Sequence, residues 1–234
     1  LTPQQLDERL HNLEERYPPE AFYAMMNLLG SHDTNRALFM LDHNTDLNDA
    51  TLYQNPAYDW SDAMTRLRGV VLLQMTLPGA PTIYYGDEVG LVGPVTYDGS
   101  TWQDDPYNRI PYPWLDQSGT PFYTHLQTQG GQDQLRDYYT VLTTARNAHP
   151  ALRTGSFDTL LVDNTANTYA YGRKMADNSD AAVVMFNRAT GGQNVVVNVS
   201  SYLPIGAQLL NVLTNQTYTV DGNGDITVTI PPMS

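Results

Sequence analysis

The chain has 234 residues, 41% of them hydrophobic, so it is long enough for one large globular domain or two smaller ones. Its formal net charge is −13 and Lys174 is its only lysine, a balance that repels phosphate and anionic lipid and argues against nucleic-acid and membrane partners. No cysteine is present, which excludes disulfides, thiolate nucleophiles and cysteine metal ligands. The lysine-poor, tyrosine-rich composition favours an exported bacterial protein, with a cytoplasmic location as the alternative.

The first predicted element is a helix. Thr2 can cap it, Pro3 suits its first turn and Gln5 completes a capping box. Apolar side chains then recur at helical spacing, at Leu6, Leu10, Leu13 and Tyr17. The proline pair 18–19 ends this helix, and a short second helix is expected over 20–24.

An apolar run from Met25 to Leu29 stops abruptly at Ser31, His32 and Asp33. The pattern predicts a short buried strand that delivers polar side chains at its C-terminal end. In a parallel α/β sheet or barrel, active sites are built at that end of the strands. We therefore expect the chemistry of this chain to lie here.

The stretch 42–59 is polar and opens with the Asp-x-Asn-x-Asp spacing of a calcium loop. Leu47 stands where such a loop needs its turn glycine, and Tyr53 stands where it needs a bidentate glutamate. An ordinary solvated loop is therefore favoured over a metal site. A similar acidic pattern at 221–225 lies between two β-like runs and predicts a hairpin turn.

A long, mostly apolar helix is predicted over 61–77, and its apolar residues occupy more than one side. A second short strand over 80–88 follows and ends in carboxylates, so strand, helix and strand form a βαβ unit. At this second tip, Asp87 is expected to support the loop rather than to contact a ligand. The next stretch, 89–130, is long and irregular, and loops of this length are usually functional.

The pattern changes in the C-terminal part of the chain. A last helix is predicted over 134–147, and from Gly155 onward the period of the apolar residues becomes two. Turn residues separate seven candidate strands, at 157–162, 168–174, 181–187, 193–199, 207–212, 216–220 and 225–230. The predicted fold class is α/β followed by all-β, with an α/β part over 1–152 and a compact antiparallel β domain over 153–234.

By themselves, His32 and Asp33 allow three interpretations: a metal site, a catalytic dyad, or a polar pair that fixes a strand end to a loop. Their place at a strand tip, followed by Arg36, favours a site that binds a polyhydroxylated substrate. Asp105 and Arg109 lie four residues apart in the long loop, beside several aromatic residues. An arginine–carboxylate pair with stacking rings suits sugar hydroxyls and apolar sugar faces, although the same set could simply anchor the loop.

Several motifs resemble those of the α-amylase family of glycoside hydrolases and follow one another along the chain in the same order as in that family. Their forms are those found in neopullulanases, cyclomaltodextrinases and amylopullulanases. Residues 27–36, Asn-Leu-Leu-Gly-Ser-His-Asp-Thr-Asn-Arg, resemble the family's fourth conserved region. Residues 77–88 resemble its eighth barrel strand and the approach to it, and 105–114 resemble the loop that follows. The segment 145–152 is similar to the end of the last barrel helix, and 155–234 to the β-sandwich domain after the barrel.

This resemblance implies the fold in more detail. Residues 1–152 would be the C-terminal part of a (β/α)₈ TIM barrel, from about the sixth helix to the eighth strand and helix. Residues 153–234 would be an antiparallel β-sandwich. The family's nucleophilic aspartate and acid/base glutamate follow the fourth and fifth barrel strands, and those stretches are absent from this sequence. Because two strands cannot close a barrel, we expect the remainder of the barrel, from the same parent chain or a complementary fragment, as a partner.

The resemblance also implies a retaining double displacement on an α-glucan: starch, pullulan, maltooligosaccharides or cyclodextrins. Asp33 would stabilise the transition state, and the substrate-binding residues would be His32, Arg36, Asp105 and Arg109. No cofactor or metal site is identifiable in the sequence, and calcium in the parent enzyme is left open. Without the two reacting carboxylates, the chain alone is expected to be inactive.

Two other interpretations compete with this one. The first is a catalytically silent relative that serves as a binding or interaction module, but such a protein would be expected to lose the transition-state carboxylate, and Asp33 and His32 are both present. The second is an independent starch-binding module over 155–234. The aromatic residues of its strands can belong to a core, namely Tyr169, Tyr171 and Tyr218.

Overall fold

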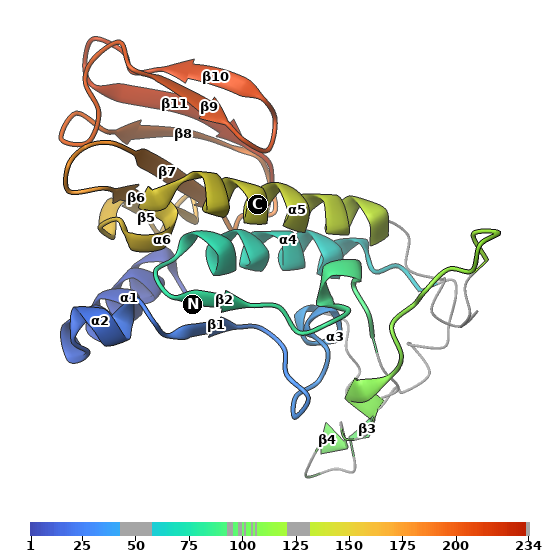
Figure 1. Cartoon of the computed structure of the whole chain (residues 1–234). Helices are drawn as coiled ribbons and strands as arrows, with labels where there is room; N and C mark the ends of the chain where they lie inside the picture. The colour runs from blue at the N-terminus through green and yellow to red at the C-terminus, as the bar shows by residue number, and fades with distance from the viewer. Residues whose placement is uncertain are drawn as a thin grey trace. The chain divides into compact units, whose positions relative to one another are not determined.

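The computed structural model describes residues 1–42, 58–92, 96–97, 100, 102–103, 105, 107–120 and 132–232 (Figure 1). Its helices are α1 (Pro3–Arg16), α2 (Pro19–Phe22), α3 (Ala37–Leu41), α4 (Ser61–Thr76), α5 (Gln132–Ala148) and α6 (Pro150–Thr154), with short 3₁₀ turns η2 (Asp87–Val89) and η3 (Tyr107–Arg109). Its strands are β1 (Met26–Leu28), β2 (Ala80–Thr82), β3 (Thr96–Tyr97), β4 (Trp102–Gln103), β5 (Asp158–Asp163), β6 (Thr168–Lys174), β7 (Ala181–Asn187), β8 (Gln193–Asn198), β9 (Gln208–Asn211), β10 (Gln216–Thr219) and β11 (Asp225–Ile230). The predicted helices are confirmed, with ends shifted by a few residues.

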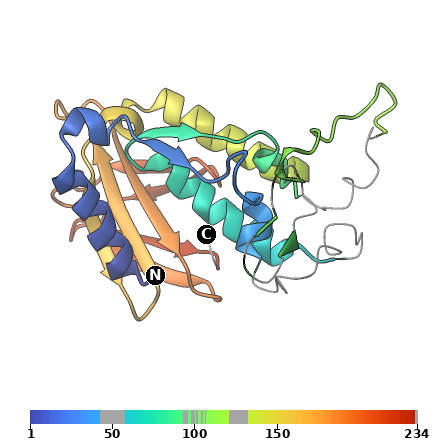
Figure 2. The same cartoon turned by 90° about the horizontal axis from the view of Figure 1, so that it is seen from below.

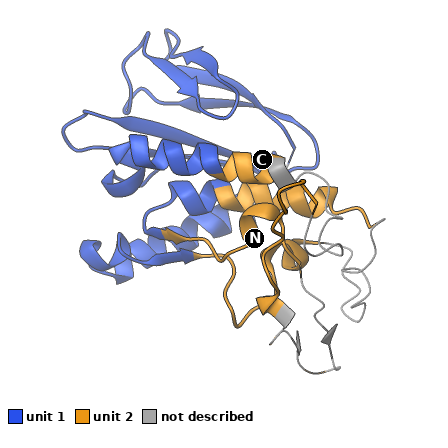
Figure 3. Ribbon diagram, turned by 45° about the vertical axis from the view of Figure 1, so that its right-hand side comes forward, with its two compact units in different colours: residues 1–27, 72–80, 140–234 blue, residues 28–71, 81–139 orange. Residues whose placement is uncertain are grey.

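The chain divides into two compact units (Figure 3). Unit 1 contains residues 1–27, 72–80 and 140–234, and unit 2 contains residues 28–71 and 81–139. This grouping assigns the end of α5 and all of α6 to the same unit as the C-terminal strands. It therefore differs from the expected division after residue 152, which stays a prediction.

The strands of unit 1 are antiparallel. β5, β6 and β7 form a three-stranded sheet with β6 in the centre, while β8 pairs with β11 and β9 pairs with β10. The register of β6 and β7 sets Thr168 opposite Asn187 and Lys174 opposite Ala181. All seven strands predicted in this part of the sequence are present.

One apolar core lies between these strands. Val195 and Val197 of β8, together with Ile226 and Ile230 of β11, are buried at alternate positions, as a period of two predicts. Ala170 of β6 packs in the same cluster. The alternation in the sequence therefore identifies the inward faces of β8 and β11 correctly, whereas β6 is buried on both faces.

The acidic stretch 221–225 forms the expected turn but not the expected hairpin. The Asp221 carboxylate accepts hydrogen bonds from the backbone N–H groups of Asn223 and Asp225, at 2.8 and 3.0 Å. The following strand, β11, pairs with β8 and not with β10. This pairing sets Ile226 opposite Val197, so that both side chains reach the shared core.

The N-terminal helix α1 begins with the predicted capping box. Gln5 N donates to Thr2 Oγ1 at 3.2 Å, and Thr2 N donates to Gln5 Oε1 at 2.9 Å. The helix lies along β5 and β6 (Figure 2). There the Tyr169 hydroxyl donates to the Asp7 carboxylate at 2.9 Å.

The C-terminal end of α4 is held by two buried arginines from later in the chain. Arg146 donates to Met75 O at 2.7 Å and to Gly79 O at 2.6 Å, and Arg173 donates to Thr76 O at 2.6 Å. A helix leaves its last four carbonyls without intrahelical partners, so these guanidinium groups satisfy the end of α4 and fix the chain as it enters β2. Neither α4 nor any other described helix is long and apolar enough to cross a bilayer.

The prediction that the strand before His32 is buried is wrong. Met26 is 63% exposed and Leu28 is 47% exposed, whereas Asn27 between them donates to Pro78 O at 3.0 Å and accepts from Gln74 at 2.9 Å. Alternate residues of a strand point to opposite faces, so Asn27 occupies the bonded face and its apolar neighbours occupy the other. Within the described residues β1 pairs only with β2, and this apolar face has no cover.

Candidate functional site

The polar segment after β1 folds into a tight turn in unit 2. Ser31 N donates to Thr34 Oγ1 at 3.1 Å, and Asp33 N donates to Ser31 Oγ at 3.2 Å. Serine and threonine hydroxyls stabilise such turns because they bond to backbone groups a few residues away. The turn leaves the side chains of His32 and Asp33 61% and 67% exposed.

Four of the five predicted site residues form a continuous row. His32 Nε2 lies 3.0 Å from Asp33 Oδ1, and Arg109 Nη2 lies 3.7 Å from the same oxygen. Arg109 Nε in turn lies 3.2 Å from Asp105 Oδ1, the pair that the four-residue spacing predicts. The structure therefore brings His32, Asp33, Arg109 and Asp105 together, and we call this set the acidic row.

Exposure determines what the acidic row can do. Its side chains are about half exposed or more, and ion pairs in such positions contribute little to stability, typically about 0–1 kcal/mol. Their effect is to orient one another. Asp33 Oδ2 has no hydrogen bond to any described residue, so it is open to a donor from a ligand.

Asn108 fixes the acidic row and lies outside the residues that the sequence motifs predict for the site. Its side chain is fully buried and its Nδ2 donates to His32 O, and to Thr34 O at 3.2 Å. This amide ties η3, which carries Arg109, to the turn that carries Asp33. The only signal in the sequence is an uncharged polar residue directly before Arg109.

The structure revises the expected role of Arg36. Its side chain is 0% exposed, donates to Tyr85 O, and lies over the rings of Tyr84 and Tyr85, with 4.5 and 4.6 Å between the guanidinium carbon and the ring centroids. A group enclosed in this way cannot contact a ligand from solvent. Arg36 therefore lies inside unit 2 at the end of the turn, and its expected contact with substrate stays a prediction that this burial does not support.

Asp87 is the buried carboxylate beside Arg36, with 3.8 Å between Arg36 Nη1 and Asp87 Oδ1. Burial raises the pKa of Asp87 to about 7, although the Arg36 guanidinium acts in the opposite direction. A Cβ atom at Gly30 would lie 2.5 Å from Asp87 Oδ2, so the chain before the turn can approach this carboxylate only at a glycine. The supporting role expected for Asp87 agrees with this position.

Exposed aromatic rings follow the acidic row in the chain. The Tyr85 hydroxyl donates to Ile110 O at 2.8 Å and anchors the segment after η3. The rings of Tyr112 and Trp114 then lie with their centroids 4.5 Å apart, and Trp114 is 63% exposed. An exposed indole offers an apolar face on which a sugar ring can stack.

The described residues contain no group of three histidine, cysteine, aspartate or glutamate side chains that could hold a metal ion. The calcium-like loop of the sequence lies outside the described residues, except for its ends at Asp42, Tyr58 and Asp59. Asp42 is buried and accepts a hydrogen bond from the Tyr58 hydroxyl.

No family model matches the chain. The chain is 33% identical over 240 residues to an amylopullulanase from Thermoanaerobacterium saccharolyticum, a match that covers 98% of this chain and 16% of that protein. It is 32% identical over 179 residues to a cyclomaltodextrinase from Bacillus sp, covering 76% of this chain and 25% of that protein. Among solved structures, Ttha1563 from Thermus thermophilus matches with a TM-score of 0.71 at 25% identity and covers 100% of this chain and 39% of that one.

The matched relatives are named as an amylopullulanase and a cyclomaltodextrinase, and both matches extend over most of this chain. The chain belongs to the α-amylase family, as the resemblance of its motifs indicated. It spans 16% of the length of the amylopullulanase and 25% of the length of the cyclomaltodextrinase that it matches.

Proposed function

We propose that this chain forms one wall of the substrate cleft in a retaining glycoside hydrolase that acts on α-glucans. Residues 1–152 would be the C-terminal part of its TIM barrel, from about the sixth helix to the eighth strand and helix, and residues 153–234 its β-sandwich domain. The acidic row carries this proposal, because it is an exposed set of donors and acceptors suited to sugar hydroxyls in a chain of the α-amylase family. The names of the relatives supply the substrate class.

Asp33 is the proposed transition-state stabiliser. In a retaining reaction the reacting sugar becomes distorted and oxocarbenium-like, and hydrogen bonds to its hydroxyls strengthen on the way to the transition state. One Asp33 oxygen faces His32 and Arg109, which leaves the other oxygen to accept from sugar hydroxyls. Because neighbouring groups already orient the carboxylate, little reorganisation is needed during the reaction. His32 would hold a neighbouring hydroxyl of the same ring.

Asp105 and Arg109 are proposed to bind the next sugar on the non-reducing side. Their 3.2 Å contact fixes a donor and an acceptor in one orientation, which suits adjacent hydroxyls of a pyranose ring. Arg36 is proposed as a positioning residue instead of a substrate ligand. Its burial supports this assignment, since it reaches the turn only from inside unit 2.

The reacting carboxylates would come from the remainder of the barrel. The exposed apolar face of β1 supports this part of the proposal, because neighbouring barrel elements would cover Met26 and Leu28. The nucleophile and the acid/base residue would then lie about 5–5.5 Å apart across the cleft.

Replacement of Asp33 in the parent enzyme tests the proposal. Asp33→Asn keeps the size of the side chain but removes its charge, so we expect kcat on a maltooligosaccharide to fall by about two orders of magnitude or more while KM changes little. Asp137→Asn, at an exposed position on α5, is the matched control and should keep normal kinetics.

The thermal unfolding midpoints of both variants should match that of the parent, which separates a catalytic defect from misfolding. Near-normal turnover by a folded Asp33→Asn enzyme would show that the turn is structural and would contradict the proposal. A parent enzyme with no α-glucan hydrolysis would favour a silent binding module instead.

A further inference from the structure

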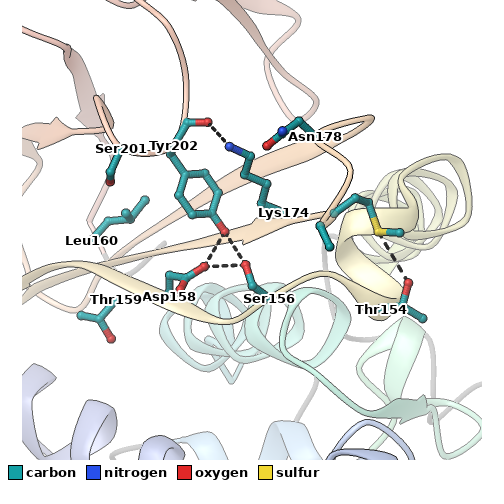
Figure 4. A pocket seen from close by; sticks show the side chains of 11 residues that line it. Thr154, Ser156, Asp158, Thr159, Leu160, Lys174, Asn178, Ser201 and Tyr202 are labelled. Atoms are coloured by element: carbon teal, nitrogen blue, oxygen red, sulfur yellow. Dashed lines mark hydrogen bonds between the residues drawn. The ribbon is translucent and has the colours of Figure 1, made fainter.

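A hollow that is separate from the acidic row lies in unit 1 beside β5 and β6 (Figure 4). Its volume is about 620 Å³, within the range of about 300–1,000 Å³ that is common for small-ligand sites. Its lining comes from the end of α6, the start of β5, the end of β6, the connection between β6 and β7, and the segment before β9. The residues that matter for its chemistry are Ser156, Asp158, Leu160, Lys174, Asn178 and Tyr202.

The base of this hollow is a fixed hydrogen-bonded triad. The Tyr202 hydroxyl donates to Asp158 Oδ2 at 2.9 Å and lies 2.9 Å from Ser156 Oγ, which also donates to Asp158 Oδ2. Burial raises the pKa of the Tyr202 hydroxyl, so this group remains a donor at neutral pH. The second oxygen, Asp158 Oδ1, accepts no hydrogen bond from a described residue and is open to the hollow.

Lys174 supplies a charge of the opposite sign. Its Nζ donates to Tyr202 O at 3.0 Å and lies 5.5 Å from the centroid of the Tyr202 ring. An ammonium group has three donors, and only one of them has a partner among the described residues. Figure 4 shows Ser156 and Asp158 at the hydroxyl end of the Tyr202 ring and the Lys174 ammonium group beside the backbone carbonyl of Tyr202.

The position of the Tyr202 ring depends on Gly172. A Cβ atom at Gly172 would lie 2.5 Å from Tyr202 Cζ and 2.9 Å from the hydroxyl oxygen. The ring can therefore lie across β6 and reach Asp158 only because this position has no side chain. The arrangement is a property of the folded backbone and not of mobile surface side chains.

The lining selects a class of ligand. One carboxylate and one ammonium group leave the lining without a net charge to attract an anion or a metal cation, and the lining also includes hydroxyl groups and the apolar side chain of Leu160. A neutral polyhydroxylated ring has this combination of hydroxyls and apolar faces. We propose that the hollow binds a segment of α-glucan, as a second carbohydrate site in addition to the acidic row. The choice of an α-glucan rests on the proposed function.

The single lysine permits a direct test. Lys174 is the only lysine among these 234 residues, so acylation by an N-hydroxysuccinimide ester, followed by mass spectrometry of the peptide that carries Lys174, reports on the hollow. We expect saturating maltoheptaose to slow acylation of Lys174 severalfold, whereas the β-linked cellohexaose should not protect it.

Variants locate the binding site. Asp158→Asn should raise the maltoheptaose concentration needed for protection about tenfold, because a hydrogen bond to a charged acceptor is lost. Asn178→Gly removes an amide at a position whose φ of +59° glycine also adopts, so it offers a second variant without backbone strain. Asp33→Asn should leave the protection of Lys174 unchanged.

The proposal of a second site would be contradicted if Lys174 were not protected in the wild-type chain. It would also be contradicted if folded Asp158→Asn and Asn178→Gly variants showed the same protection as the wild type. Because this readout is binding and not turnover, the two proposals fail separately. An active parent enzyme with unprotected Lys174 would refute only the second site. A protected Lys174 in an inactive parent would refute only the proposed hydrolysis.

Discussion

Arg36 and Arg109 carry the same guanidinium group and serve different purposes because they differ in exposure. Arg36 is enclosed by Tyr84 and Tyr85, whereas Arg109 is 45% exposed between Asp33 and Asp105. The sequence places both beside polar motifs and does not distinguish them. The rings that bury Arg36 come from a segment almost 50 residues away, so its burial could not be predicted from local pattern.

Substitution of Arg109 should weaken substrate binding. In the parent enzyme, Arg109→Ala removes the donor that faces both Asp33 and Asp105, and we expect KM to rise about tenfold with a smaller change in kcat. Steady-state kinetics on maltooligosaccharides measure this effect. Arg16→Ala, at the exposed end of α1, is the matched control. An unchanged KM in Arg109→Ala would show that Arg109 does not bind substrate.

Asp87 should make stability depend on pH. Its pKa in the folded chain is about 7, above the value of about 3.9 in an unfolded chain, so the folded state keeps a proton that the unfolded state releases between these values. The free energy of unfolding of the wild type, relative to Asp87→Asn, should therefore fall as pH rises from about 4 to 7. Urea unfolding of both proteins at several pH values tests this, and a difference that stays constant with pH would contradict it.

At the scale of elements, the acidic row depends on the contact between η3 and the turn after β1. Asn108 provides that contact through two backbone carbonyls. Asn108→Ala would remove this donor from both carbonyls and leave a gap at a fully buried position, and we expect a loss of about 1–3 kcal/mol in the free energy of unfolding. Asn164→Ala removes exposed hydrogen bonds to Gln4 and should change it by less than about 0.5 kcal/mol. Equal effects of the two variants in urea unfolding would show that Asn108 is not an anchor.

Elements defined by local signals could be predicted from the sequence. The capping box at Thr2 fixes the start of α1, and the alternating runs 168–174, 181–187 and 225–230 are strands with the expected bounds. The pairing of one strand with another could not be predicted from local signals. The choice of β8 as the partner of β11 depends on a core that only the folded strands create.

The exposure of β1 also could not be predicted from the sequence. An apolar run indicates that side chains will be covered, but it does not specify by which residues. Within the described chain, β2 and the end of α4 account for one face of β1 only. Of the site, the motifs predicted the four members of the acidic row, whereas Asn108 and the enclosure of Arg36 required the folded chain.

For the whole molecule, the proposal predicts that the purified 234-residue chain does not hydrolyse α-glucans. Asp33 can stabilise a transition state, but the chain lacks the nucleophile and acid/base pair that a retaining mechanism needs. Release of reducing sugar from starch, pullulan and cyclodextrins measures this, with the parent enzyme as the positive control. Clear turnover by the pure chain would contradict the proposed division of roles.

Arg146 and Arg173, which donate to the carbonyls at the C-terminal end of α4, have a consequence for the order in which the chain folds. The carbonyls of Met75, Thr76 and Gly79 bond to Arg146 and Arg173, which are 67 to 97 residues further along the chain. During synthesis, the segment that leads into β2 therefore emerges well before the groups that hold it. Such long-range contacts form late because their chain closure is costly in entropy. We expect the anchoring of β2 to be completed only after translation has passed β6.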